Sequence, residues 1–244
     1  MFHRVILPLF LLLVSPLAAQ VHDSGNYPYT LRGEVWIDLE PIYGGYIEDE
    51  YPVNTRTAAL RALELSAMFF SGMIYGWSFS YDIGERARRI SENFELKPVA
   101  SIPFGDSGLS VTEVEIKDHK VRMWADYNLS DPQQRRLAAW QTGNIRRAQG
   151  IGYWLPGLPP VPSTGGLGSH QDGIWLEVKR IALEDAARAA VRGMLQGSER
   201  NRPKEAHGFI SLASFPHYYI DSGRWAVSAR FRVEITEIIP FAVH

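Results

Sequence analysis

The sequence predicts an α+β fold made of two related strand–helix–β-hairpin units with antiparallel sheet. Three observations predict it. An apolar strand followed by Asp-Ser-Gly occurs twice, at residues 99–108 and 212–223. Strict alternation of apolar and polar side chains runs through residues 225–236, as in a half-buried strand. Each copy also follows a stretch with the apolar spacing of a helix. The units either form two domains or share one sheet in a single pseudo-symmetric domain.

The composition is that of an ordinary globular protein. The 244 residues are 45% hydrophobic, carry a formal net charge of −2 and include no cysteine. A chain of this length can be stable through its core alone. The missing thiols exclude a cysteine nucleophile, a thiolate zinc site and any disulfide. Because the net charge is close to zero, we also expect no nucleic-acid partner.

Residues 1–19 have the order of a secretory signal peptide. A basic start precedes an apolar stretch over residues 5–14, and small residues follow it. The apolar stretch is shorter than the roughly 20 residues of a membrane-spanning helix. We therefore expect cleavage after Ala19 or after Gln20, with an uncleaved anchor as the alternative. After cleavage we expect no transmembrane segment and a periplasmic or secreted protein.

The first unit is expected over residues 20–149 and opens with a strand and a helix. Residues 35–39 have the order apolar, Trp, apolar, acid, apolar, which favours a strand. Asn54 can cap the helix that follows, because its side-chain oxygen can accept a backbone N–H of the first turn. Apolar residues then recur at three- and four-residue spacing until Gly72, which we expect to end the helix.

A hairpin and a further strand come next. Residues 99–103 predict one strand, Asp106-Ser107-Gly108 the turn and residues 111–116 the returning strand, since Asp and Gly suit tight turns. Asp118-His119 predicts a second turn. The strand after it places apolar side chains on one face, and these are Val121, Met123, Ala125, Tyr127 and Leu129.

Two further helices are expected in the first unit alone. Asp82-Ile83-Gly84-Glu85 has the form of a capping box and predicts a short helix through Phe94. Ser130-Asp131-Pro132 predicts a helix to about Ala148, because proline is well tolerated at the first helical position.

A Gly/Pro-rich segment over residues 150–168 favours a linker or an exposed loop, and the second unit is expected over residues 169–244. Ile174–Val178 matches the leading strand of the first unit and predicts a strand. However, Ser169-x-x-Asp172 is also a capping box that could start one long helix there. A helix over residues 181–195 and the second hairpin complete the unit.

Tyr75, Trp77, Phe79 and Tyr81 alternate along the chain and predict a strand with one aromatic face. Two interpretations stay open. Such a face can pack over the helix beneath it, or it can bind a sugar, a peptide or a partner protein, because aromatic rings combine large contact area with polar tips. These four residues are the candidate binding residues.

The seven histidines give no metal-ligand spacing. The sequence also has no HExxH, no Gly-x-Ser-x-Gly and no phosphate-binding glycine motif, so we expect no metal site and no cofactor. His170 with Asp172, and His217 with Asp221, come closest to acid–base pairs and would be the first residues to examine in a hydrolase. Surface histidines in turns are the alternative interpretation.

Paired arginines occur at Arg88-Arg89, Arg135-Arg136 and Arg146-Arg147. We interpret these pairs as parts of solvated helix faces.

The stretch from Gly72 to Tyr81, together with the signal peptide, resembles uncharacterised exported proteins of spirochaetes. The resemblance implies export, and it implies no activity and no site residue.

No motif identifies a nucleophile, a base, a metal or a phosphate site. We therefore expect a soluble, exported, non-enzymatic binding or structural protein of the cell envelope, with an envelope protein or a glycan as partner. The alternative is a hydrolase acting on an envelope polymer.

Overall fold

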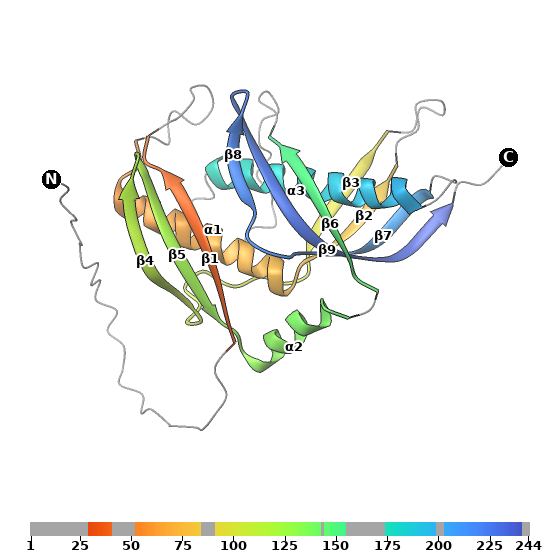
Figure 1. Ribbon diagram of the computed structural model, residues 1–244, viewed down its shortest axis with the longest axis horizontal. Coiled ribbons are helices and arrows are strands. Elements are labelled where there is room, and N and C mark those ends of the chain that lie inside the picture. The colour runs from red at the N-terminus through yellow and green to blue at the C-terminus, as the bar shows by residue number, and fades with distance from the viewer. Residues whose placement is uncertain are drawn as a thin grey trace.

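The computed structural model describes residues 29–40, 52–83, 91–142, 144–154, 174–198 and 203–240. These residues form an α+β fold of helices and antiparallel sheet (Figure 1). In chain order the elements are β1 (Thr30–Asp38), α1 (Thr55–Ile74), β2 (Trp77–Asp82), β3 (Asn93–Pro98), β4 (Leu109–Lys117), β5 (Lys120–Asn128), α2 (Asp131–Ala139), β6 (Arg146–Tyr153), α3 (Ile174–Ser198), β7 (Pro203–Leu212), β8 (His217–Asp221) and β9 (Arg224–Pro240).

The strands form two antiparallel sheets. The smaller has the order β1-β5-β4, and the larger has the order β3-β2-β7-β9-β6, with β8 paired to β9. Strands from both predicted units lie in the larger sheet, because β2 pairs with β7 and β6 pairs with β9. The structure does not confirm a pseudo-symmetry between the units, since the predicted leading strand of the second unit, residues 174–178, is helical.

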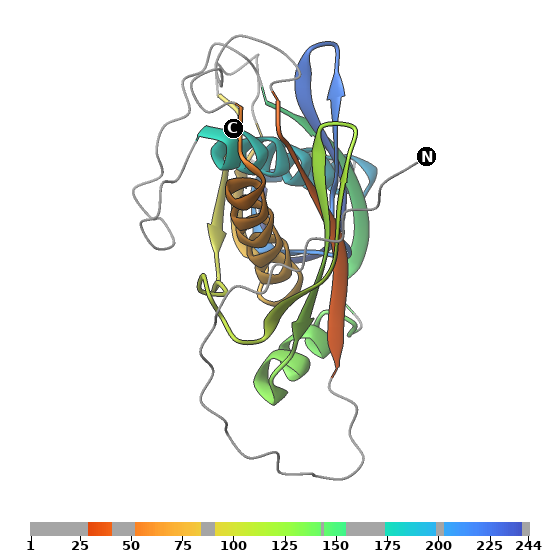
Figure 2. The ribbon, with the colours of Figure 1, turned by 90° about the vertical axis from the view of Figure 1, so that its left-hand side faces the viewer.

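Two long helices cover one side of the strands. Helix α1 packs against β1 and β5 and also against β7, so it joins the two sheets, while α3 packs on β6 and β9. Figure 2 shows both helices on the same side of β1, β5, β6 and β8. The approach of α3 is close because β6 carries glycine where the helix crosses. A Cβ atom at Gly150 would lie 1.9 Å from the carbonyl oxygen of Ala186.

Several predicted elements are confirmed. Asn54 caps α1 by accepting the backbone N–H of Thr57 at 2.8 Å. Asp118 and His119 both have positive φ, as a two-residue hairpin turn between β4 and β5 requires. Strand β9 is buried on the face that alternation predicts, and Asp221 to Arg224 closes its hairpin with β8. The incoming strand of that hairpin is residues 217–221 and not the predicted residues 212–216, of which only Leu212 lies in a strand.

The first predicted hairpin is wrong. Residues 99–103 form no strand, and β4 pairs with β5 instead. The backbone N–H of Ile102 donates to Ser71 Oγ at 2.9 Å, and the Ile102 side chain is buried, so this segment is attached to the end of α1. The turn at Asp106 does form, because its side chain accepts the backbone N–H of Gly108.

Both extra helices predicted for the first unit differ from the elements in the structure. The helix that starts at Asp131 ends at Ala139, where the Trp140 indole donates to the carbonyl of Ile74 at 3.0 Å and redirects the chain. Residues 146–153 then form β6, so the expected linker begins inside a strand. Asp82 ends β2 and Phe94 lies in β3, and residues 84–90 between them lie outside the described residues.

Two helix boundaries also differ from the prediction. Ile174–Val178 is the first part of α3 and not a strand, which agrees with the long-helix alternative. Gly72 does not end α1, which continues to Ile74. A Cβ atom at Gly72 would lie 2.2 Å from the Trp77 ring, so the glycine is needed for close packing.

Helix α1 is also long and apolar enough to cross a membrane by length and composition alone. In the fold, 61% of its most apolar window is buried, as is common for the core helix of a globular protein. The signal peptide predicted over residues 1–19 lies outside the described residues.

Candidate functional site

The candidate aromatic residues lie on β2 and at the end of α1, against the core. The Phe79 and Tyr81 side chains are 4% and 0% exposed. The Tyr81 hydroxyl donates to Glu92 at 2.6 Å, and the ring meets Phe94 edge to face. These two side chains therefore stabilise the packing of β2.

Trp77 and Tyr75 are half-buried. Trp77 packs over Gly72, and the Tyr75 hydroxyl accepts the side-chain amide of Gln133 at 2.8 Å. The same amide donates to the Tyr127 hydroxyl, so Gln133 connects α2 to the core. A partner that binds at Tyr75 or Trp77 stays a prediction.

The candidate acid–base residues are not brought together. His217 is exposed and stacks on Tyr219 with ring centroids 5.7 Å apart. Asp221 accepts the hydroxyl of Ser222. No ion pair joins His217 to an acid among the described residues, and His170 and Asp172 lie outside them.

A buried lysine occupies the junction of β1, α3 and the β8–β9 hairpin. The Lys179 side chain faces four aromatic rings, with its ammonium 4.9 Å from the Trp225 centroid and 5.3 Å from that of Trp36. Trp175 and Tyr218 lie slightly farther away. Aromatic faces attract cations, most strongly where water is excluded. We call Lys179 with these four rings the lysine cage.

One buried carboxylate, Asp38, lies near the lysine cage, together with the cations Lys120 and Arg61. Asp38, 4% exposed, lies 3.6 Å from the ammonium of Lys120 and also attracts Lys179. Burial lowers the pKa of Lys179 to about 8, while Asp38 opposes that shift. Burial also raises the pKa of Asp38 above its usual range, although Lys120 and Lys179 counteract the change. Such a cluster connects three elements, and no described cavity opens onto it.

The larger sheet has an opposite face that neither long helix covers. Its side chains alternate with those that point to the helices, so Ser78 and Ser80 of β2 and Gln149 of β6 lie on it. Two hollows indent this face. One is lined by Ser78, Phe79, Ser80, Glu95, Lys97, His207, Gly208, Phe209 and Thr236. The other is lined by Gln149, Ser214, Phe215, His217, Ser228 and Arg230. We call this surface the open face.

The open face also carries three arginines on β6 and β9. Arg147 stands directly opposite Arg232, and Arg230 stands opposite Gln149. We call these three residues the arginine patch. Neither Arg147 nor Arg230 makes a side-chain ion pair with any described residue. Charge and hydrogen-bonding groups thus accumulate beside the second hollow, where a ligand could reach them.

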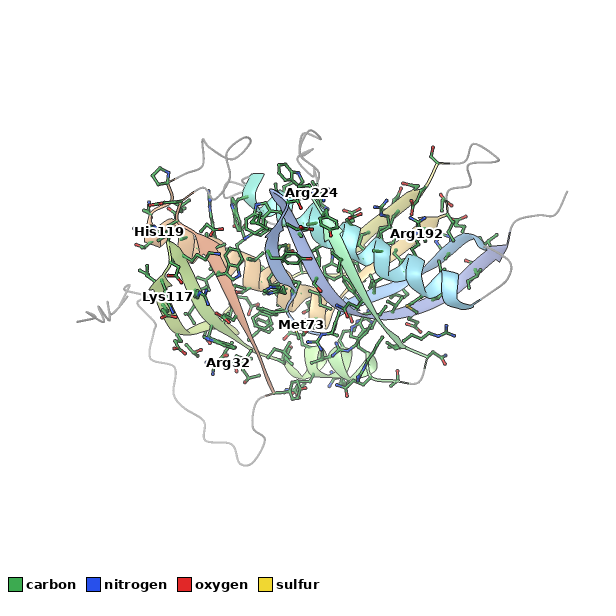
Figure 3. The ribbon with its side chains drawn as sticks, turned by 45° about the horizontal axis from the view of Figure 1, so that its top comes forward. Arg32, Met73, Lys117, His119, Arg192 and Arg224 are labelled. Atoms are coloured by element: carbon green, nitrogen blue, oxygen red, sulfur yellow. The ribbon has the colours of Figure 1, made fainter. Side chains whose placement is uncertain are left out.

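Three arginines elsewhere in the fold each lie beside an acidic side chain or an aromatic ring (Figure 3). Arg32 lies 3.6 Å from Asp126, and Arg192 lies 3.5 Å from Glu92. Arg224 lies over the ring of Tyr153, 4.8 Å from its centroid. The arginine patch differs from these because Arg147 and Arg230 have no such partner in the part of the chain that the structure describes.

Sequence reasoning missed both clusters. The sequence predicts that Arg146-Arg147 lies on a helix face, but the pair lies on β6, and only the pairing with β9 brings Arg147 to Arg232. The spacing of Trp175 and Lys179, four residues apart on one helix, could have indicated a cation beside an aromatic ring. Nothing local indicated the other three rings.

Comparisons with known proteins identify relatives but no activity. A protein-family model matches residues 21–155 and 160–241. A protein of Treponema pallidum (strain Nichols), described as uncharacterised, is 26% identical over 216 residues, which cover 88% of this chain and 83% of that protein. No solved structure matches significantly. Because the family model covers well over half of the chain and the relative is a spirochaete protein, the chain belongs to a family of uncharacterised spirochaete proteins, as the resemblance of residues 72–81 predicted.

Proposed function

We propose that the protein is exported through its N-terminal signal peptide to the periplasm and acts there as a non-enzymatic binding protein of the cell envelope. The open face is the observation that carries this proposal. It offers polar and charged side chains from several strands of one rigid sheet, and sites on strands hold their groups more precisely than sites on loops.

The side chains that line the second hollow support binding. Gln149 donates to the hydroxyl of Ser228 at 3.2 Å, so two strands already hold these polar groups in place. Phe215 forms an apolar wall and is itself fixed by Phe69 and Phe70, with ring centroids 5.1 and 4.8 Å away. Binding sites commonly combine such an apolar wall with a few placed polar groups.

The geometry gives the hydrolase alternative no support among the described residues. A general base needs an orienting partner and access to a reacting atom. His217 has a ring neighbour in Tyr219 and no acid partner there.

Site-specific photo-cross-linking in intact cells tests the binding proposal. A photoreactive residue at Gln149 lies in the second hollow, whereas one at Thr112 lies on the exposed edge strand β4 of the smaller sheet and serves as the matched control. We expect a discrete cross-linked product from position 149 and none of the same size from position 112. Equal products from both positions, or none from position 149, would reject the open face as the binding surface.

Cell fractionation and N-terminal sequencing test export separately. We expect the mature chain in the periplasmic fraction, starting after Ala19 or after Gln20. An unprocessed chain in the cytoplasmic fraction would contradict this part of the proposal.

A further inference from the structure

The arginine patch holds like charges together. Residues directly opposite on antiparallel strands point to the same face with Cβ atoms about 5 Å apart. Arg147 and Arg232 are such a pair, and Arg230 precedes Arg232 by two residues on β9, so all three side chains leave the same face. Like charges placed directly opposite each other destabilise a sheet.

Arg232 is fixed within the patch. Its guanidinium donates to the carbonyl oxygens of Leu212 and Ala213 at 3.0 and 3.4 Å, and the side chain is half-buried. Burial lowers the pKa of Arg232, and the neighbouring Arg147 lowers it further. The fold therefore keeps one anchored cation and leaves Arg147 and Arg230 exposed beside it.

The second hollow adjoins Arg230 and offers the remaining groups that a polar ligand needs. The hydroxyls of Ser214 and Ser228, the amide of Gln149 and the ring of His217 line it. These groups can donate to or accept from hydroxyls, whereas the arginines can donate only.

We propose that the arginine patch binds the oxyanion of a ligand, a phosphate or carboxylate group, while the hollow receives the hydroxylated body that carries it. This inference rests on the proposed function and names its ligand class. The planar guanidinium fork matches phosphate and carboxylate oxygens in pairs, which explains why exposed arginines suit this task. An oxyanion also supplies the opposite charge that Arg147 and Arg230 lack among the described residues.

Calorimetric titration of the intact mature protein tests the inference. Glucose 6-phosphate, glucuronate and glucose are the probes, so that phosphate, carboxylate and the uncharged sugar are compared on similar bodies. We expect at least one charged probe to bind saturably and at least tenfold more tightly than glucose. The probe that binds better shows whether phosphate or carboxylate is the preferred group.

Arginine variants distinguish binding at the arginine patch from general attraction of an anion to positive charge. Arg147→Gln/Arg230→Gln should weaken the charged probe at least tenfold. Arg146→Gln is the matched control, because Arg146 lies on the same strand but opposite Val233, whose side chain points to the helix side. We expect its affinity to stay within twofold of the unaltered protein.

Three results would overturn the inference. They are binding of neither charged probe, equal binding of glucose, and an equal loss in Arg146→Gln and the double variant. If cross-linking from position 149 persists in such a case, the open face still binds a partner and only the ligand class is wrong. If that cross-linking is also absent, the proposed function fails as well.

Discussion

The lysine cage and the arginine patch place cations in opposite surroundings. Lys179 is 5% exposed, and aromatic rings and a carboxylate surround it. Arg147 and Arg230 are exposed, and both lie beside Arg232, Arg147 across the strands and Arg230 two residues away on β9. A buried cation must be compensated from every side for the fold to form. An exposed cation left beside like charges contributes nothing comparable to folding, which favours a role in binding.

The largest effect is expected from removing the carboxylate near the lysine cage. Asp38→Asn would leave Lys120 and Lys179 without their buried counter-charge, and breaking such a cluster typically costs about 3–5 kcal/mol. Glu34→Gln on the same strand is the control, because its pair with Arg122 is exposed and such pairs contribute less than about 1 kcal/mol. Urea unfolding measures both changes. Similar losses of unfolding free energy in the two variants would show that Asp38 stabilises the fold no more than an exposed ion pair does.

The second-largest effect is expected in the pH dependence of the free energy of unfolding. Because the pKa of Lys179 is lowered to about 8 in the folded protein, the unfolded chain binds more protons than the folded one above that pH. Stability should therefore rise between pH 8 and 9.5 by about 1.5 kcal/mol, because the slope is about half of 1.36 kcal/mol per pH unit at pH 8 and approaches that value above pH 9. Above about pH 10, ionisation of tyrosines in the unfolded chain opposes the rise, because Tyr81 and Tyr218 have raised pKa values in the fold.

Lys179→Met isolates this contribution. An apolar side chain of similar length should leave stability at pH 7 unchanged or higher, because it removes a buried charge. Its unfolding free energy should lack the extra rise between pH 8 and 9.5. If the variant and the unaltered protein showed the same pH profile, Lys179 would not titrate as its surroundings imply.

The smallest effect is expected at the arginine patch. Arg147→Gln removes one of two like charges that face each other across β6 and β9. Relief of that repulsion should raise the free energy of unfolding by about 0.2–1 kcal/mol. Thermal unfolding at low salt measures the gain, and high salt should reduce it. A loss of stability would mean that Arg147 has a structural role, and the contrast with Lys179 would disappear.

Local patterns predicted those elements whose signal is local. The alternation of β9, the cap at Asn54 and the turn at Asp118 all depend on neighbouring residues, and all three are correct. Residues 174–178 differ from the predicted strand because Trp175 and Val178 suit a strand or a helix equally well, and the packing of α3 on β6 and β9 is not visible in the local sequence.

Long-range pairing explains the remaining errors. The first Asp-Ser-Gly turn resembles the second, yet the strand after it pairs with β5 rather than with residues 99–103. The candidate clusters were missed for the same reason. Arg147 and Arg232 lie far apart in the chain, and the register of β6 against β9 alone makes them neighbours.

Arginine side-chain NMR during a titration with glucose 6-phosphate and glucuronate tests the central claim most directly. The Nε–Hε signals of Arg147 and Arg230 should shift saturably with at least one of these probes. The signals of Arg32, Arg192 and Arg224, which already have partners, should not shift. Equal shifts across all five arginines, or shifts confined to the partnered three, would contradict the claim that the arginine patch is a binding site.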